Sequence, residues 1–461
     1  MESDELCRAA ENYLEHHESQ AEAVSEISIT LCLLSGKQVE ISLAQDASFA
    51  DLRRSVEKTL ALPPQLVRFF LAEAELTARY DVKLSDGGVV DGSLLTLVTS
   101  GEEYEEVHLE SYGPQMVPKR LEMIRADSAG HGAGWTSFEF RDSRTGDMVS
   151  LRCQHFAHRD PVDLADCHQE ILILQKFKHE NLLRLIDLLP PLAANKHFRE
   201  AVCIIVEHMD TTLSSVIRSK QELTQEHCQY LSYQILRALC YMHSAGCVHG
   251  QLQPNCVLVN RNCHVKVSNF REVLELGKGQ PRDHDAARWY RAPELNLNTD
   301  WQALPISGAI DIWNAGAILF EMYKRKPLFI CTDLADHLKK VLSVTGFPAE
   351  AEMDWVTKRA KDYMAKMPAA PAPIGWKERM GGSEAACELM ARIVRFDPRQ
   401  RCSCQEALQL RYFTDWSDPE DSQMDRCETP IDWPELQRMR EEGQFENYLR
   451  EECSRRHPEL C

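Results

Sequence analysis

The chain lacks the features that would indicate a membrane or secreted protein. No apolar run reaches about 18 residues, so no transmembrane helix is expected. The N-terminal stretch MESDELCRAAENYLEHH is acidic and has no apolar signal core. The 17 cysteines are scattered singly apart from Cys402 and Cys404, so no paired C-x-x-C zinc site is indicated. We therefore expect reduced thiols and a cytoplasmic or nuclear location.

Basic charge is also scarce. Lys and Arg number 52 against 71 Asp and Glu, which gives a formal net charge of −19. Nucleic acids and anionic membranes favour basic patches, so we expect neither as a partner and favour basic peptides or basic protein faces. With 461 residues and 44% hydrophobic content, the composition is typical of a globular protein with two or three domains.

Residues 25–100 show a compact pattern of strands and one helix, after a polar segment at 1–24. Alternating apolar residues over 27–33 and 39–43, separated by a Ser-Gly-Lys turn, predict a hairpin. Ser48 can cap a following helix whose apolar stripe comprises Phe49, Leu52, Val56 and Leu60. Further strands are predicted at 67–71 and 95–98.

The β-β-α-β-β order resembles the ubiquitin (β-grasp) fold, matched by ISITLCLLSGKQVEISL, PPQLVRFF and GSLLTLV. The resemblance implies an apolar binding patch of Leu34, Phe70 and Val98, with ubiquitin-receptor proteins as its partners. The alternative interpretation is that these three are ordinary half-buried sheet residues. Conjugation is not expected, because the segment has no terminal Gly-Gly. It continues into GEEYEEVHLE, and residues 101–118 are interpreted as a solvated acidic linker.

Two later segments carry a second resemblance. HGQLQPNCVLVNRNCHVKVSNFR at 249–271 and ARWYRAPE at 287–294 resemble the catalytic, metal-binding and APE segments of eukaryotic protein kinases. The resemblance implies an α+β, bilobal protein-kinase fold over 119–414, with the small lobe at 119–209 and the large lobe at 210–414.

The groups that handle phosphate in that family are replaced here. Gln251 stands for the catalytic Asp, Gln253 for the following Lys, Cys256 for the metal-binding Asn and Asn269 for the metal-binding Asp. Mg²⁺ prefers charged oxygen ligands, and glutamine cannot accept a proton as a carboxylate does. Hence no metal is expected.

The nucleotide cleft is degenerate in the same way. The phosphate-covering loop has Gly130 and Gly132 but Trp135 in place of its third glycine, and Arg152 replaces the phosphate-binding lysine. We expect an Arg152–Glu170 pair to hold the helix that carries Glu170. Adenine would contact the segment with Val206 and Met209, which leaves open a weak, metal-free binding of ATP.

The residues that hold the kinase fold together are present. The resemblance assigns His249 and Phe270, with Leu174 and Leu185, to an internal spine of stacked side chains. It assigns Asp311 to the anchor of the catalytic loop, and a buried pair to Glu294 and Arg401.

Within the kinases, the closest resemblance is to the MAP kinase group. KHENLLRLIDLL, QILRALCYMHSAG and YFTDWSDPED carry it over roughly residues 119–440. The activating Thr-x-Tyr falls on Arg-Asp-His at 282–284, so that activation is not expected. In the C-terminal extension, 415–461, the acidic cluster Asp418, Glu420 and Asp421 resembles the docking site for basic peptides; a solvated acidic tail is the alternative. Residues 431–449 resemble the part that packs on the small lobe.

These observations predict a MAP-kinase-like pseudokinase that acts as a scaffold or docking protein. Two alternatives stay open: a weakly active Ser/Thr kinase with an atypical ATP site, and a ubiquitin-pathway adaptor that works through the N-terminal domain.

Overall fold

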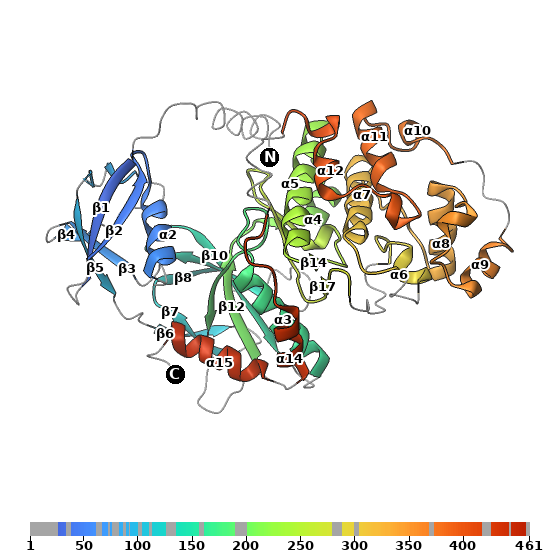
Figure 1. The fold of residues 1–461 in the computed structure, drawn as a ribbon. Coiled ribbons are helices and arrows are strands. Elements are labelled where there is room, and N and C mark those ends of the chain that lie inside the picture. Colours follow the sequence, from blue (N-terminus) through green and yellow to red (C-terminus); the bar gives the residue numbers. More distant parts are fainter. Residues whose placement is uncertain are drawn as a thin grey trace.

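The computed structural model describes residues 26–33, 38–60, 67–71, 74–75, 83–85, 89–91, 93–99, 104–109, 113–125, 135–155, 161–189, 201–278, 288–298, 304–367, 373–416, 426–441 and 444–457. Their elements form an N-terminal sheet with one helix, a small lobe built on a second sheet, and a helical large lobe (Figure 1).

The N-terminal sheet has the order β2-β1-β5-β3-β4, with β1 parallel to β5. Its elements are β1 (Glu26–Leu33), β2 (Gln38–Ala44), α2 (Phe49–Leu60), β3 (Val67–Leu71), β4 (Ala74–Glu75) and β5 (Leu94–Thr99). The predicted hairpin is present as the antiparallel β1–β2 pair. The amide of Asp51 donates to the Ser48 hydroxyl at 3.4 Å, which starts α2 as the sequence predicted. The helix buries Phe49, Leu52 and Val56 against this sheet.

The segment interpreted as an acidic linker is partly a hairpin, which corrects that prediction. Strands β6 (Tyr104–Leu109) and β7 (Gly113–Pro118) pair antiparallel. Leu109 and Val117 are buried in one cluster with the small-lobe residues Phe138 and Ile205. Acidic residues are the most frequent feature of this segment's sequence. Its buried apolar residues Leu109 and Val117 nevertheless determine its structure, because they cover a hydrophobic face of the small-lobe sheet.

The small-lobe sheet has the order β11-β12-β10-β9-β8. Its elements are β8 (Leu121–Arg125), β9 (Thr136–Asp142), β10 (Met148–His155), α3 (Pro161–Lys176), β11 (Leu185–Leu189) and β12 (Ala201–Glu207). β10 is central, because it pairs with β9 on one side and β12 on the other. The sheet therefore fixes Arg152 on β10, while α3 carries Glu170.

Helices dominate the large lobe. They are α4 (Leu213–Arg218), α5 (Gln225–Ser244), α6 (Glu294–Leu297), α7 (Ala309–Lys324), α8 (Leu334–Thr345), α9 (Lys358–Met364), α10 (Trp376–Met380), α11 (Glu384–Ile393) and α12 (Cys404–Leu408). One-turn 3-10 helices lie at η3 (Pro254–Cys256), η5 (Glu350–Glu352), η6 (Pro398–Gln400) and η7 (Arg411–Phe413). Short strands pair as β13 (Thr211–Thr212), β15 (Val257–Val259) and β16 (Val265–Val267), and as β14 (Cys247–Val248) with β17 (Leu274–Glu275).

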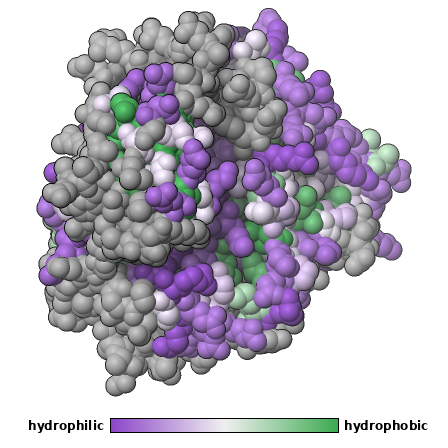
Figure 2. Space-filling view, turned by 60° about the vertical axis from the view of Figure 1, so that its left-hand side comes forward, coloured by the Kyte–Doolittle hydropathy of each residue, from purple (hydrophilic) through white to green (hydrophobic). Residues whose placement is uncertain are grey.

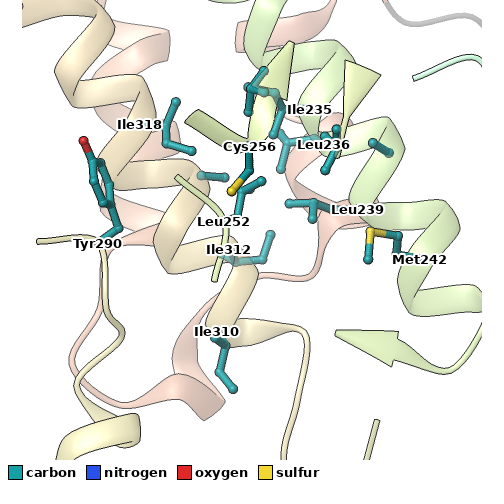
Figure 3. Packing of buried hydrophobic residues seen from close by; sticks show 14 of the residues in the cluster. Ile235, Leu236, Leu239, Met242, Leu252, Cys256, Tyr290, Ile310, Ile312 and Ile318 are labelled. Atoms are coloured by element: carbon teal, nitrogen blue, oxygen red, sulfur yellow. The ribbon is translucent and has the colours of Figure 1, made fainter. Parts of the chain in front are cut away.

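The core of this lobe lies between α5 and α7. A capping box starts α5, since the Thr224 hydroxyl accepts from the His227 amide and the Thr224 amide donates to His227 Nδ1. Figure 3 shows Leu236 and Leu239 of α5 facing Ile312 and Ile318 of α7. This packing gives the catalytic loop, which begins at His249 after α5, a rigid base.

The C-terminal helices α14 (Trp433–Glu441) and α15 (Phe445–Arg456) lie alongside the small lobe (Figure 1). Leu436 and Met439 of α14 pack with Leu172 of α3. The Tyr448 hydroxyl donates to Gln175 Oε1 at 3.0 Å, and His457 Nε2 lies 3.1 Å from Asp187 Oδ1. The C-terminal extension thus packs on the small lobe, as the MAP kinase resemblance predicted.

The described surface in Figure 2 is mostly hydrophilic, with apolar side chains visible mainly between polar ones. Among the described helices, none is both long and apolar enough to cross a membrane.

Candidate nucleotide site and catalytic loop

The backbone of the catalytic loop is anchored by one buried carboxylate. Asp311 on α7 is fully buried and accepts hydrogen bonds from the amides of His249 at 2.8 Å and Gly250 at 2.9 Å. Its Oδ2 also lies 2.9 Å from His243 Nε2. Gly250 has φ +77°, a conformation that glycine adopts without steric strain. The loop therefore keeps a defined backbone whatever its side chains are.

A second buried ion pair ties α6 to the rest of the large lobe. Both Arg401 terminal nitrogens donate to the Glu294 carboxylate, at 2.6 and 2.8 Å. The Arg401 guanidinium also lies over the Trp313 ring, 4.8 Å from its centroid. This bidentate, stacked geometry is the arrangement in which arginine forms its strongest pairs with carboxylates.

The spine residues stack between the lobes. The Phe270 ring meets Phe177 edge-on at 5.3 Å and His249 at 6.1 Å. His249 Nε2 lies 3.1 Å from the carbonyl oxygen of Ser268, and burial lowers the pKa of His249 so that the ring stays neutral. Leu174 is buried and Leu185 is half-buried.

The side chains at the positions of the missing base and metal ligands form hydrogen bonds within the site. The side-chain Nε2 of Gln251 donates to the Glu272 carboxylate. Asn269 Nδ2 donates to Cys256 Sγ at 3.5 Å, and Asn269 Oδ1 is buried without a hydrogen-bond partner among the described residues. Asn269 has φ +70°, which asparagine tolerates better than most residues.

Cys256 is built into the core. Figure 3 shows its sulfur beside Leu252, close to the side chains of α5. Burial raises the pKa of the Cys256 thiol to about 11, so it is protonated at neutral pH. Gln253 precedes η3 and is half-buried, and its carbonyl accepts from the Cys256 amide at 2.8 Å. A soft, protonated thiol and one neutral amide oxygen are poor ligands for Mg²⁺. Within the described part of the chain, no group of three or more His, Cys, Asp or Glu could hold a metal ion.

Three side chains from separate segments of the chain meet around the carboxylate of α3. We call Trp135, Glu170 and Arg271 the indole cluster. Trp135 Nε1 donates to Glu170 Oε2 at 2.9 Å, and Arg271 Nε donates to the same oxygen at 3.1 Å. The Arg271 guanidinium lies over the Trp135 ring at 5.5 Å. Glu170 Oε1 accepts from the Phe270 amide at 3.3 Å.

This cluster corrects the predicted Arg152–Glu170 pair, which the structure does not form. The described residues contain no hydrogen bond or ion pair that joins the two side chains. Arg152 is only 6% exposed and its Nε has no hydrogen-bond partner there. Burial lowers the pKa of Arg152, against the raising effects of Glu170 and Glu207. Glu170 instead bonds with Arg271 and Trp135, because these two side chains reach its oxygens directly.

The adenine end keeps its apolar lining. Val206 on β12 and Met209 are both buried, and Ser150 Oγ lies 3.1 Å from His208 Nδ1. Other predicted site residues fall outside the described residues: Gly130, Gly132, Arg282, Asp283, His284, Leu34, Asp418, Glu420 and Asp421. Phe70 and Val98 lie in the paired strands β3 and β5, where Arg68 is opposite Val98.

The indole cluster was missed from the sequence, although a signal for it exists. By the kinase resemblance, a large aromatic at 135 replaces the third glycine of the phosphate-covering loop, and a large cation at 271 replaces the glycine after the Phe of the D-F-G motif. An indole face and a guanidinium attract each other. Two such replacements on facing segments indicate a direct contact, but only if both are considered together.

Comparisons with known proteins identify relatives. The family model described as "Protein kinase domain" matches residues 125–413. "Mitogen-activated protein kinase 1" of Oryza sativa subsp. japonica is 34% identical over 312 residues, 68% of this chain and 76% of that protein. "Mitogen-activated protein kinase 3" of Arabidopsis thaliana is 32% identical over 326 residues, 70% of this chain and 86% of that protein.

Proposed function

Since the chain belongs to the protein kinase family, within the MAP kinase group, we propose that it is a pseudokinase that transfers no phosphate and acts as a scaffold or docking protein. The observation that carries the proposal is the indole cluster. The helix acid Glu170 bonds to Trp135, which stands at the third glycine of the phosphate-covering loop, and to Arg271.

The chemistry of the remaining positions supports the same proposal. Phosphoryl transfer depends on positioned Mg²⁺, a residue that orients or deprotonates the acceptor hydroxyl, and a cation on the phosphates. Here Gln251 bonds to Glu272, and Asn269 bonds to Cys256. Arg152 stands in place of the phosphate-binding lysine, and its side chain is buried. No described side chain replaces the lost base and both metal ligands together.

Phosphate transfer from γ-labelled ATP to a generic basic protein, with Mg²⁺ present, tests the inactivity. An active MAP kinase is the positive control. We expect no transfer above the no-enzyme background. Transfer that disappears in Arg152→Ala would support the alternative of a weakly active Ser/Thr kinase with an unusual ATP site.

The docking role is tested separately. We expect a basic docking peptide to be retained by the full chain and lost after charge reversal of Asp418, Glu420 and Asp421, because charge attraction steers such peptides to acidic clusters. Charge reversal of the exposed Glu350, Asp362 and Glu378 is the matched control and should leave retention unchanged. An equal loss of peptide retention in both triple variants would show that the interaction depends on net charge and not on this acidic cluster.

One observation favours the ubiquitin-pathway alternative. The sheet order β2-β1-β5-β3-β4, with α2 packed on it, is the arrangement that the β-grasp resemblance implies. On this second proposal the domain binds ubiquitin-receptor proteins through Leu34, Phe70 and Val98. Binding that is lost in Phe70→Ala and kept after reversal of the acidic cluster would assign the interaction to this domain.

A further inference from the structure

Two cysteines of the small lobe face each other across neighbouring strands. Cys153 on β10 and Cys203 on β12 are direct partners in the antiparallel register. Their Sγ atoms lie 2.7 Å apart, against about 2.05 Å in a formed disulfide. Directly opposed residues of an antiparallel pair have Cβ atoms about 4.5–5.5 Å apart, whereas a disulfide spans about 3.5–4.5 Å. The sulfurs are therefore already in contact, and a small approach of the two strands would allow a bridge.

The pair is enclosed on the outer face of the sheet. Cys153 is fully buried and Cys203 is 5% exposed. Both pack with Leu109 and Val117 of the β6–β7 hairpin, and Cys203 Sγ lies 3.5 Å from Gln115 Oε1 on the same hairpin. Cys153 follows Arg152 along β10, so the two side chains point to opposite faces of the sheet. The thiols and Trp135 of the indole cluster also belong to different core clusters.

We propose that Cys153 and Cys203 are a reversible dithiol–disulfide site, oxidised by a small peroxide. One sulfur attacks a hydrogen peroxide oxygen, which breaks the O–O bond and gives a sulfenic acid and one water. The second sulfur attacks the sulfenic sulfur, so that the S–S bond forms and a second water leaves. In sum, two thiols and one peroxide give one disulfide and two waters, and the two electrons pass from the sulfurs to the peroxide.

The surroundings set the rate of the two steps. Burial raises the pKa of the Cys153 thiol, so few thiolates form and the first step is slow. The second step is fast, since the partner sulfur is held in contact and does not have to diffuse. The disulfide joins β10 to β12 around the segment that includes α3. It restricts the unfolded chain and should raise the melting temperature.

The experiment treats the full chain with hydrogen peroxide, alkylates the remaining thiols and maps the disulfide peptides by mass spectrometry. We expect a Cys153–Cys203 linkage, loss of two free thiols, and a melting temperature raised by roughly 5–10 °C that dithiothreitol reverses. Cys203→Ala and Cys153→Ala should each abolish the linkage and the shift. Cys263→Ala, a buried cysteine of the large lobe, is the matched control and should keep both.

Three results would overturn the proposal. One is a linkage that joins Cys203 to Cys167, the buried thiol on α3. The second is no linkage at a peroxide dose that oxidises exposed methionines of the same sample. The third is an unchanged melting temperature in a sample that is fully linked. If an alanine variant fails to fold, the linkage map of the unmodified chain still decides between these results.

Discussion

Each lobe contains a buried glutamate that the kinase family places in an ion pair with a basic residue. The two glutamates differ in whether they keep the expected partner. In the large lobe Glu294 keeps its arginine, Arg401, in a bidentate pair. In the small lobe Glu170 has exchanged the expected partner on β10 for Trp135 and Arg271. The Glu294–Arg401 pair has a structural role, and both of its members are present as the resemblance predicts. The second contact set joins α3 to Trp135 and Arg271 through Glu170.

This difference separates two requirements that an active kinase combines. Anchors such as Asp311 hold backbone atoms, and any sequence that keeps the fold must keep them. The groups around the phosphates hold a ligand, and they are free to change once the ligand is no longer needed. The proposed pseudokinase role would require the first set and not the second.

The strongest test of the large-lobe side is Glu294→Gln. It leaves the Arg401 cation buried and unpaired, so we expect the free energy of unfolding to fall by about 3–5 kcal/mol. Urea denaturation followed by circular dichroism measures it. Asp354→Asn, which breaks the exposed contact with Arg399, should change stability little. Equal effects in the two variants would remove the distinction between anchor and surface pair.

The indole cluster should respond more weakly. Glu170→Gln removes a buried charge-assisted contact with Arg271 and should lower the free energy of unfolding by about 1.5–3 kcal/mol. Trp135→Phe removes only the indole N–H donor and should lower it by about 1 kcal/mol. If both changes were neutral, the cluster would not hold the α3 helix.

Acid provides a third test, in the large lobe. Burial lowers the pKa of His337 to about 4, from about 6.5 in the unfolded chain. Between these values the unfolded chain binds a proton that the folded chain does not, so stability falls as the pH is lowered. At pH 5 this amounts to about 2 kcal/mol. Denaturation at pH 7 and pH 5 should show a smaller loss in His337→Gln than in the unmodified chain; the same loss in both would contradict the buried, neutral ring.

The smallest effect is expected where the C-terminal extension meets α3. Tyr448→Phe removes the hydroxyl that donates to Gln175 and should cost about 0.5–1.5 kcal/mol, measured by denaturation. Tyr363→Phe, at an exposed tyrosine, is the control and should be neutral. If neither Tyr448→Phe nor Glu170→Gln changed the free energy of unfolding, neither contact would be shown to stabilise α3.

The sequence predicted much of this framework because its signals are local. The stripe Phe49, Leu52 and Val56 predicted a helix and its buried face, and the strand at 67–71 has the predicted bounds. The β6–β7 hairpin was not predicted, because an acidic segment resembles a linker until the sheet that it covers is known.

The site was also predictable only where its signals are local. Replacements at single motif positions, such as Gln251 and Asn269, can be read directly from the sequence. The new partner of Glu170 cannot, since Trp135 and Arg271 are more than a hundred residues apart and meet only in the folded chain. The resemblance supplied the expected partner, Arg152, and the structure supplied the actual ones.

The most direct test of the central claim is the melting temperature of the full chain with ATP, with and without Mg²⁺. A bound ligand at 100 times its dissociation constant stabilises a protein by about 2.7 kcal/mol, which shifts the melting temperature by several degrees. We predict no Mg²⁺-dependent shift, because Trp135 replaces the third glycine of the phosphate-covering loop and no group of three or more His, Cys, Asp or Glu among the described residues could hold the metal. A melting temperature that rises only when ATP and Mg²⁺ are both present would contradict this account.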